Sequence, residues 1–252
     1  MTVMERPTEG GEAEFHQQHR VFASHQSFEK IRRLFPQVTK MKVLDIGCGN
    51  GTIGQELIQQ GNFVWGMDIN EEAARLSTEK GLKVSLWDSN RTWPYANDFF
   101  DVVLATDVLE HLYDWGFIFA EASRVLKANG SFIVVTPNHF DVQSRINILL
   151  GRGIVHWSRR KEIPNALAYP HIRFPLLSDI IALAASHHLY PDLIVLNFMS
   201  GKFPPAIFLP GFVRRSFLTA FPGLYSGKFG IRFTTAKNDT KVIALAKTPK
   251  GY

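Results

Sequence analysis

Residues 43–54 read VLDIGCGNGTIG, a hydrophobic run that passes into a glycine-rich turn and then into a helical pattern. Gly47, Gly49 and Gly51 let the backbone turn sharply and approach a ligand with no Cβ in the way. The free N–H groups at the start of the following helix add hydrogen-bond donors to the same place. The segment therefore predicts a strand, a ligand-binding turn and a helix, in that order.

The same alternation continues on both sides of this turn. The runs that predict strands lie at 42–46, 63–67, 82–86, 101–105, 131–136, 193–198 and 241–247. Helical patterns lie at 52–60, 71–80, 115–126 and 178–187, the last with Ser178 as its N-cap. This order predicts a doubly wound α/β fold, in which helices cover both faces of a seven-stranded, mostly parallel sheet.

We expect one domain over residues 15–252, preceded by a polar, flexible tail at 1–14. An amphipathic helix from Phe15 to about Leu34 leads into the sheet. Two segments, at about 137–177 and 199–240, are too long for ordinary connections. Both follow strands whose carboxyl ends form the ligand edge of an α/β sheet, so we interpret them as insertions on the substrate side of the site.

The composition excludes several classes of protein. The single cysteine, Cys48, cannot form an intramolecular disulfide or a cysteine-based zinc site. The N-terminal sequence lacks the apolar core of a signal peptide, and no apolar run reaches the roughly 18 residues that a membrane span needs. We therefore expect a cytoplasmic location, or a peripheral one on the inner face of a membrane.

The charge is divided unevenly along the chain. Residues 1–150 hold 14 Lys and Arg against 19 Asp and Glu, whereas residues 151–252 hold 14 against 4, so the net charge of +5 combines −5 and +10. The basic part predicts an acidic partner, such as a phosphate-bearing substrate, an anionic membrane surface or nucleic acid.

Three carboxylates, Asp45, Asp68 and Asp88, stand at the carboxyl ends of the first three predicted strands. The glycines at 49, 51 and 54 satisfy the dinucleotide pattern G-x-G-x-x-G, which leaves an NAD-type oxidoreductase open. However, a cluster of carboxylates would repel a pyrophosphate and attract a sulfonium cofactor that carries an amino group and an adenosine.

Several ordered motifs resemble those of class I S-adenosylmethionine-dependent methyltransferases. They are D-x-G-x-G-x-G at 45–51, GMDIN at 66–70, Asp88-Ser89, FDVVLATDVLEHL at 100–112 and RVLKANGSFIVVTPN at 124–138. The resemblance covers about 42–138, with a weaker echo at 171–189. It implies a Rossmann-like sheet whose last strand is antiparallel, the cofactor S-adenosyl-L-methionine and the product S-adenosyl-L-homocysteine.

The resemblance also implies cofactor-binding residues. The loop residues Gly47, Cys48, Gly49 and Gly51 would line the methionine part, with Asp45 near its amino group. Asp68 would hold the ribose hydroxyls, and the adenine would lie against Ile69, Asp88 and Ser89. Ala105 and Thr106 would approach the reactive centre. Small residues are common in this loop, so Cys48 needs no catalytic role.

Methyl transfer is a direct displacement in which the protein mainly aligns the reactants. A base is needed only when the acceptor must lose a proton, and His111 and His171 are the candidate catalytic residues. We predict no metal site, because among His16, His19 and His25 only the first two share a helix face.

The acceptor stays open at this point. Aromatic residues recur every four or five positions over 203–233, interleaved with Arg and Lys, which suits a lipid acceptor at an anionic membrane or a soluble hydrophobic or phosphorylated metabolite. A protein acceptor also remains. Nucleic acid is disfavoured because no known RNA-binding module is present. A cofactor-binding module without turnover is a further alternative.

Overall fold

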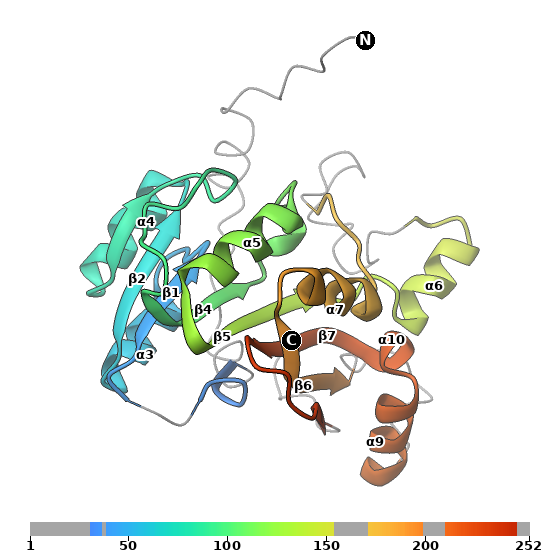
Figure 1. Ribbon diagram of the computed structural model, residues 1–252. Coiled ribbons are helices and arrows are strands. Elements are labelled where there is room, and N and C mark those ends of the chain that lie inside the picture. The colour runs from blue at the N-terminus through green and yellow to red at the C-terminus, as the bar shows by residue number, and fades with distance from the viewer. Residues whose placement is uncertain (1–30, 37–38, 154–170, 199–209, 246–252) are drawn as a thin grey trace, which may run out of the picture.

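The computed structural model describes residues 31–36, 39–153, 171–198 and 210–245 (Figure 1). The described residues form one sheet with the strands β1 (Lys42–Ile46), β2 (Phe63–Asp68), β3 (Lys83–Leu86), β4 (Phe100–Thr106), β5 (Leu126–Pro137), β6 (Tyr190–Phe198), β7 (Ser226–Thr234) and β8 (Lys241–Leu245). The helical elements are α3 (Thr52–Gln59), α4 (Glu71–Glu79), η1 (Leu109–His111), α5 (Trp115–Val125), α6 (Val142–Leu149), α7 (Leu177–Ser186), α9 (Gly211–Ala220) and α10 (Pro222–Tyr225).

The strands follow the order β3-β2-β1-β4-β5-β7-β6-β8 across the sheet. β7 pairs antiparallel with both β5 and β6, whereas the other described pairings are parallel. The predicted doubly wound α/β fold with a mostly parallel sheet is therefore confirmed.

Two details of the predicted sheet are corrected. The sheet has eight strands among the described residues, not seven, and the last strand, β8, is parallel to β6 rather than antiparallel. The antiparallel strand is β7, which lies inside the segment 199–240 that we interpreted as an insertion. Its sequence, SGKFGIRFT, contains two glycines and alternating basic residues, which obscured the period-two pattern of a strand.

The position of β7 also corrects our interpretation of the aromatic residues over 203–233 as one acceptor or membrane surface. Phe229 and Phe233 are buried in the core with Ile231 between them, on one face of the strand. Arg232 points the other way and forms an ion pair with Asp192 of β6, with 2.6 Å between Nη2 and Oδ2. These residues therefore build the sheet, whereas Phe212 and Phe221 are exposed. Phe203 and Phe208 of the same run lie outside the described residues.

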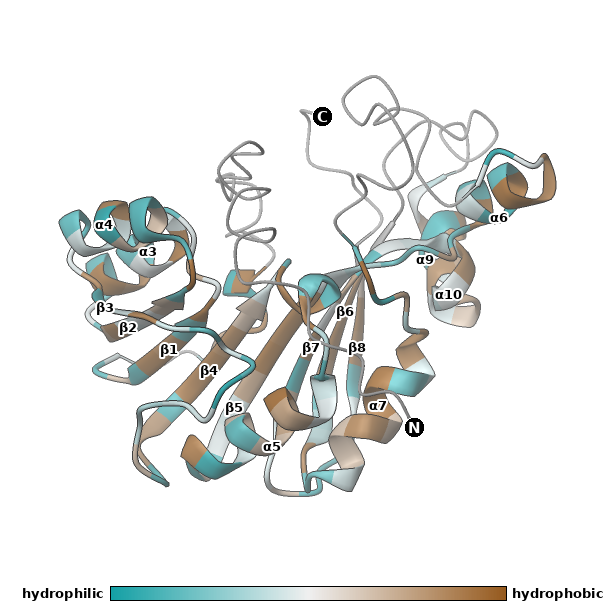
Figure 2. Ribbon diagram, turned by 90° about the horizontal axis from the view of Figure 1, so that it is seen from above, coloured by the Kyte–Doolittle hydropathy of each residue, from teal (hydrophilic) through white to brown (hydrophobic). Residues whose placement is uncertain are grey.

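Helices cover both faces of the sheet, as Figure 2 shows for α3 and α4 on one side and α5 and α7 on the other. Alternate residues of β1 supply the two layers: Leu44 packs in the cluster with α5 and α7, and Val43 in the cluster that contains Leu57 of α3. Every one of these side chains is fully buried, because a central parallel strand faces helices on both sides.

The helix boundaries follow local capping chemistry. Asn70 and Asp114 cap α4 and α5 by accepting from the backbone N–H groups of Ala73 and Phe117. Helix α7 begins one residue before the predicted cap Ser178, because Asp179 accepts a hydrogen bond from the backbone N–H of Leu176.

Several expectations fall outside the described residues. Of the predicted N-terminal helix only the end is described, and its Ile31 and Leu34 are buried against the sheet. The tail at 1–14 and the three N-terminal histidines lie outside the described part. None of the helices that the structure describes is long and apolar enough to span a bilayer.

Candidate active site

The glycine-rich turn after β1 is fixed to the end of β2. The N–H groups of Gly47 and Cys48 donate to the carbonyl oxygen of Met67 at 2.7 and 3.2 Å. The N–H of Gly49 donates to Oδ2 of Asp68 at 2.9 Å. The loop and the predicted ribose-binding carboxylate therefore form one rigid unit at the carboxyl edge of the sheet.

Of the three glycines in the turn, Gly49 alone has open space beside it where a side chain would lie. A Cβ on Gly47 would lie 2.4 Å from Cγ2 of Val108, and a Cβ on Gly51 would lie 2.8 Å from Cα of Ser77. A Cβ on Gly49 would meet nothing within 4 Å. Packing within the protein accounts for Gly47 and Gly51, whereas Gly49 faces a space beside Asp68 that a ligand can occupy.

Asp45 lies in β1 two residues before this loop and is only 2% exposed. Burial, reinforced by the nearby charge of Asp68, raises the pKa of Asp45 to about 7. A cationic ligand group close to the carboxylate would favour its ionised form. The amino group of S-adenosylmethionine has that charge, so the buried acid fits the predicted cofactor.

Asp68 is half-buried, and its Oδ1 accepts from the backbone N–H of Asn70 at 2.9 Å. A carboxylate has about four acceptor positions, so after the two backbone bonds it can still accept hydroxyl groups. Ile69 follows it directly after β2 and is also half-buried.

Asp88 and Ser89 belong to the turn after β3. Oδ1 of Asp88 accepts from both the backbone N–H and the side-chain amide of Asn90 at 2.9 Å. The carbonyl oxygen of Ser89 accepts from Nε1 of Trp93 at 3.0 Å. Asp88 thus shapes the turn, and its Oδ2 lies 3.8 Å from Nε of Arg91 in an ion pair at the surface.

The end of β4 closes the cofactor side. Ala105 is fully buried in the core, so its side chain serves packing. Oγ1 of Thr106 is buried and has no hydrogen-bond partner among the described residues. Such an atom at the site is suited to a ligand. Burial raises the pKa of the Cys48 thiol, so this cysteine stays protonated and is not poised as a nucleophile.

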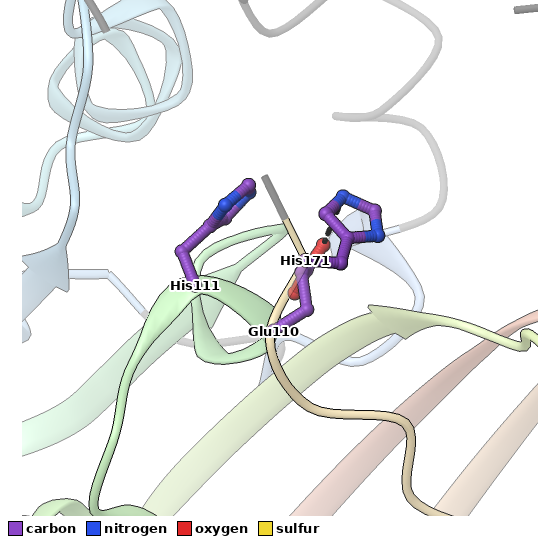
Figure 3. Close-up of side chains that lie close together, drawn as sticks. All are labelled: Glu110, His111 and His171. Carbon is purple, nitrogen blue, oxygen red and sulfur yellow. Dashed lines mark ion pairs between the residues drawn. The ribbon is translucent and has the colours of Figure 1, made fainter. Parts of the chain in front are cut away.

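A second group of side chains lies beyond the cofactor side. Figure 3 shows Glu110 and His111 of η1 beside His171, which comes from the segment that precedes α7. Glu110 is 1% exposed, and burial together with the charge of Asp107 raises its pKa to about 8. The predicted candidates His111 and His171 are thus brought together, with ring centroids 4.9 Å apart.

The backbone holds this group in place. The N–H of Ile172 donates to the carbonyl oxygen of Glu110 at 2.9 Å. Nδ1 of His171 lies 2.6 Å from Nε2 of His139, which is buried just after β5. His139 was not among the predicted site residues, and its place directly after a predicted strand end was the signal that could have identified it.

Asp107 and Lys228 were also missed as a pair. Asp107 adopts a left-handed backbone conformation with φ 52° at the end of β4. Nζ of Lys228 lies 2.7 Å from its Oδ1. Because β7 runs antiparallel, the start of that strand and hence Lys228 reach the same edge as the ends of β4 and β5.

Comparisons with known proteins agree with the predicted class of protein. A family model described as a methyltransferase domain matches residues 44–134. A ubiquinone biosynthesis O-methyltransferase of Rickettsia canadensis is 29% identical over 133 residues, which are 51% of this chain and 56% of that protein. A protein of the same name from Pelagibacter ubique is 33% identical over 113 residues, 43% of this chain and 47% of that protein.

The solved structure of a SAM-dependent methyltransferase from Archaeoglobus fulgidus shares the fold, with a TM-score of 0.61 and 17% identity over 87% of this chain and 97% of that one. Sheet order, glycine-rich turn and acidic strand ends define the fold of class I S-adenosylmethionine-dependent methyltransferases. Residues 44–134 match the methyltransferase-domain model, and S-adenosyl-L-methionine is the cofactor of the class that has this fold. The chain spans about half the length of the two relatives that it matches in sequence.

Proposed function

We propose that this chain transfers the methyl group of S-adenosylmethionine to a small-molecule or lipid-type acceptor, with S-adenosylhomocysteine as the second product. The observation that carries the proposal is the open space at Gly49, bordered by Asp68, whose charge in turn acts on the buried Asp45. A neutral, rigid backbone surface flanked by two acids suits a cationic nucleoside better than it suits a pyrophosphate.

In this proposal each cofactor part has its own residues. Asp45 lies near the amino group, Asp68 accepts from the ribose hydroxyls, and Asp88 accepts from the adenine amino group. Ile69 packs on the adenine with Ser89 beside it, and Thr106 supplies its buried hydroxyl near the reactive centre. When bound, the cofactor supplies an activated methyl group on a sulfonium.

The protein's contribution is mainly alignment. The acceptor atom attacks the methyl carbon opposite the sulfur, so a rigid loop on one side and a shaped acceptor site on the other lower the barrier by fixing the approach. Lys228 and Asp107 attach β7 to this edge and so fix the acceptor side relative to the cofactor side.

The relatives named for ubiquinone biosynthesis support an oxygen atom on a hydrophobic small molecule as the acceptor. His111 and His171 lie on the acceptor side, where a hydroxyl group must lose its proton. A small-molecule acceptor that carries a phosphate is a more specific alternative, and the net charge of +10 over residues 151–252 favours it.

The exposed apolar side chains of α6 and α9 support a peripheral location on an anionic membrane. Leu149 is 86% and Phe212 is 72% exposed, and Arg215 is exposed on the same helix as Phe212. Both views place α6 and α9 at the same end of the molecule (Figures 1 and 2). Apolar side chains flanked by arginines insert into the boundary of an anionic bilayer.

The membrane location is tested by cosedimentation with vesicles of phosphatidylglycerol and phosphatidylcholine. Binding should weaken when Arg214 and Arg215 are replaced by Ala, and should weaken with salt. Absence of binding at every salt concentration would eliminate the membrane location and leave a soluble acceptor.

Methyl transfer is tested by incubating the full chain with methyl-labelled S-adenosylmethionine and fractionated extract, followed by mass spectrometry of the labelled product. The proposal predicts label on a small hydrophobic molecule. Label on protein or RNA would replace the acceptor class. Cofactor binding without label in any fraction would favour a binding module, and nicotinamide binding would favour an oxidoreductase.

A further inference from the structure

We propose that Glu110, His111 and His171 hold one divalent transition-metal ion on the acceptor side of the site. Each residue offers one ligand atom, and these atoms all lie within 4.8 Å of one another (Figure 3). The metal's role in methyl transfer rests on the proposed function, but metal binding itself does not. It also departs from our expectation of no metal site, which considered only the N-terminal histidines.

The donor set points to a particular class of ion. Two imidazole nitrogens and one carboxylate oxygen suit Zn²⁺, Mn²⁺, Co²⁺ or Fe²⁺ better than the all-oxygen ions Ca²⁺ and Mg²⁺. Ligand bonds of about 2.0–2.2 Å require the donor atoms to close to roughly 3–3.5 Å from one another. His111 is only half-buried, and ion binding requires its side chain to turn toward Glu110 and His171 to reach this spacing.

One of the two imidazoles is already oriented for the task. Nδ1 of His171 engages Nε2 of the buried His139 at 2.6 Å, which turns Nε2 of His171 toward Glu110. Nε2 lies 4.0 Å from Oε1 of Glu110. Metal-bound histidines typically use the second ring nitrogen in this way, because the outer hydrogen bond fixes the tautomer and the ring plane.

The charge of the site favours a cation as well. The Glu110 carboxylate is almost completely buried, with the Thr136 hydroxyl 3.4 Å from its Oε2. Lys228, whose charge acts on Glu110, pairs with Asp107. A buried carboxylate is expensive without a compensating charge, and a divalent ion between Oε1 and the two imidazoles supplies it.

Three protein ligands leave coordination positions open, and an acceptor hydroxyl oxygen can take one of them. The ion then lowers the pKa of that hydroxyl, and its proton leaves to solvent. An electron pair of the oxygen forms the bond to the methyl carbon while the carbon–sulfur bond breaks, and the electron pair of that broken bond stays on sulfur, which becomes a neutral thioether. The acceptor class that this site fits is therefore a hydroxyl-bearing molecule.

The test is calorimetric titration of the chelator-treated, dialysed full chain with Zn²⁺ and with Mn²⁺. We expect one ion to bind per chain at this site, and at least a tenfold loss of that affinity in Glu110→Gln, His111→Ala and His171→Ala. His139→Ala should lower the affinity by about tenfold or more without removing the site. His187→Ala is the matched control, since it removes an imidazole at the end of α7 outside this group.

Two readouts separate this inference from the proposed function. Binding of S-adenosylhomocysteine should be unchanged in His111→Ala, whose half-exposed side chain can be removed without unfolding the chain. Equal metal affinity in the wild type and all three ligand variants, with S-adenosylhomocysteine still bound, would overturn the metal site alone. Retained metal binding without any S-adenosylhomocysteine binding would overturn the proposed function alone.

Discussion

Lys228 at the start of β7 forms an ion pair with Asp107 at the end of β4, across 121 residues of sequence, with 2.7 Å between Nζ and Oδ1. The antiparallel strand thereby joins the cofactor-binding part of the chain to the basic C-terminal part. Both side chains are more than a quarter exposed, so the pair contributes position more than stability.

Replacement of Lys228 by Met should lower the free energy of unfolding by about 1 kcal/mol, because Asp107 loses its partner in a partly solvated place. For a chain of this size that corresponds to a melting temperature about 2–4 °C lower. Thermal unfolding of K228M, D107N and the double variant measures the coupling. Strictly additive losses would show that the two charges do not interact.

The pKa of Asp45 gives a pH dependence. It rises from 3.8 to about 7 in the folded chain, so between these values the folded state holds a proton that the unfolded state has lost. The free energy of unfolding should therefore fall as pH rises from about 4 to 7. Above pH 7 the buried carboxyl is ionised and the loss of stability is complete. Urea unfolding at several pH values should show a flatter profile for Asp45→Asn. A parallel profile would contradict the assignment.

The same carboxyl should couple pH to ligand affinity. An ammonium group near Asp45 stabilises the ionised form, so S-adenosylhomocysteine should bind more tightly as pH rises through about 7, up to the pH at which its own amino group titrates. Calorimetry over pH 6 to 8 measures this trend, with Asp45→Asn as the comparison. If the affinity of the wild type did not change with pH between 6 and 8, the ligand's amino group would not lie near Asp45.

Two phenylalanines test the corrected reading of the aromatic run. Phe229→Ala should cost about 3–5 kcal/mol of stability, because the ring is 1% exposed within the core of the sheet. Phe212→Ala should change stability by no more than about 0.5 kcal/mol, since that ring is 72% exposed on α9. Chemical denaturation compares the two, and similar effects would contradict the position of β7.

Local chemistry made the cofactor edge predictable. Asp45, Asp68 and Asp88 each close a short hydrophobic strand, and in a parallel sheet such ends meet at one edge whatever the rest of the chain does. The glycines of the loop were equally predictable from the sequence, because a sharp turn between a strand and a helix needs them. The open space at Gly49 was not, since it depends on which neighbours fill the adjoining positions.

The acceptor side was less predictable because its contacts are distant in sequence. His171 approaches His139 across 32 residues, and Lys228 approaches Asp107 across 121, so both depend on the course of long connections. The glycines and basic residues of β7 obscured its strand pattern. The run at 241–247 was therefore predicted to be the last, antiparallel strand. Placing β7 next to β5 is what reveals Lys228 as part of the site.

Cofactor binding depends most on the ligand space at Gly49 and the carboxylate of Asp68 beside it. Calorimetric titration with S-adenosylhomocysteine should show binding to the wild type and to Asp239→Ala, which removes an exposed acid between β7 and β8. Asp68→Ala and Gly49→Val should abolish that binding, because one removes the ribose acceptor and the other fills the open space with a branched side chain. Unchanged affinity in both variants, with the chain folded, would contradict the cofactor site.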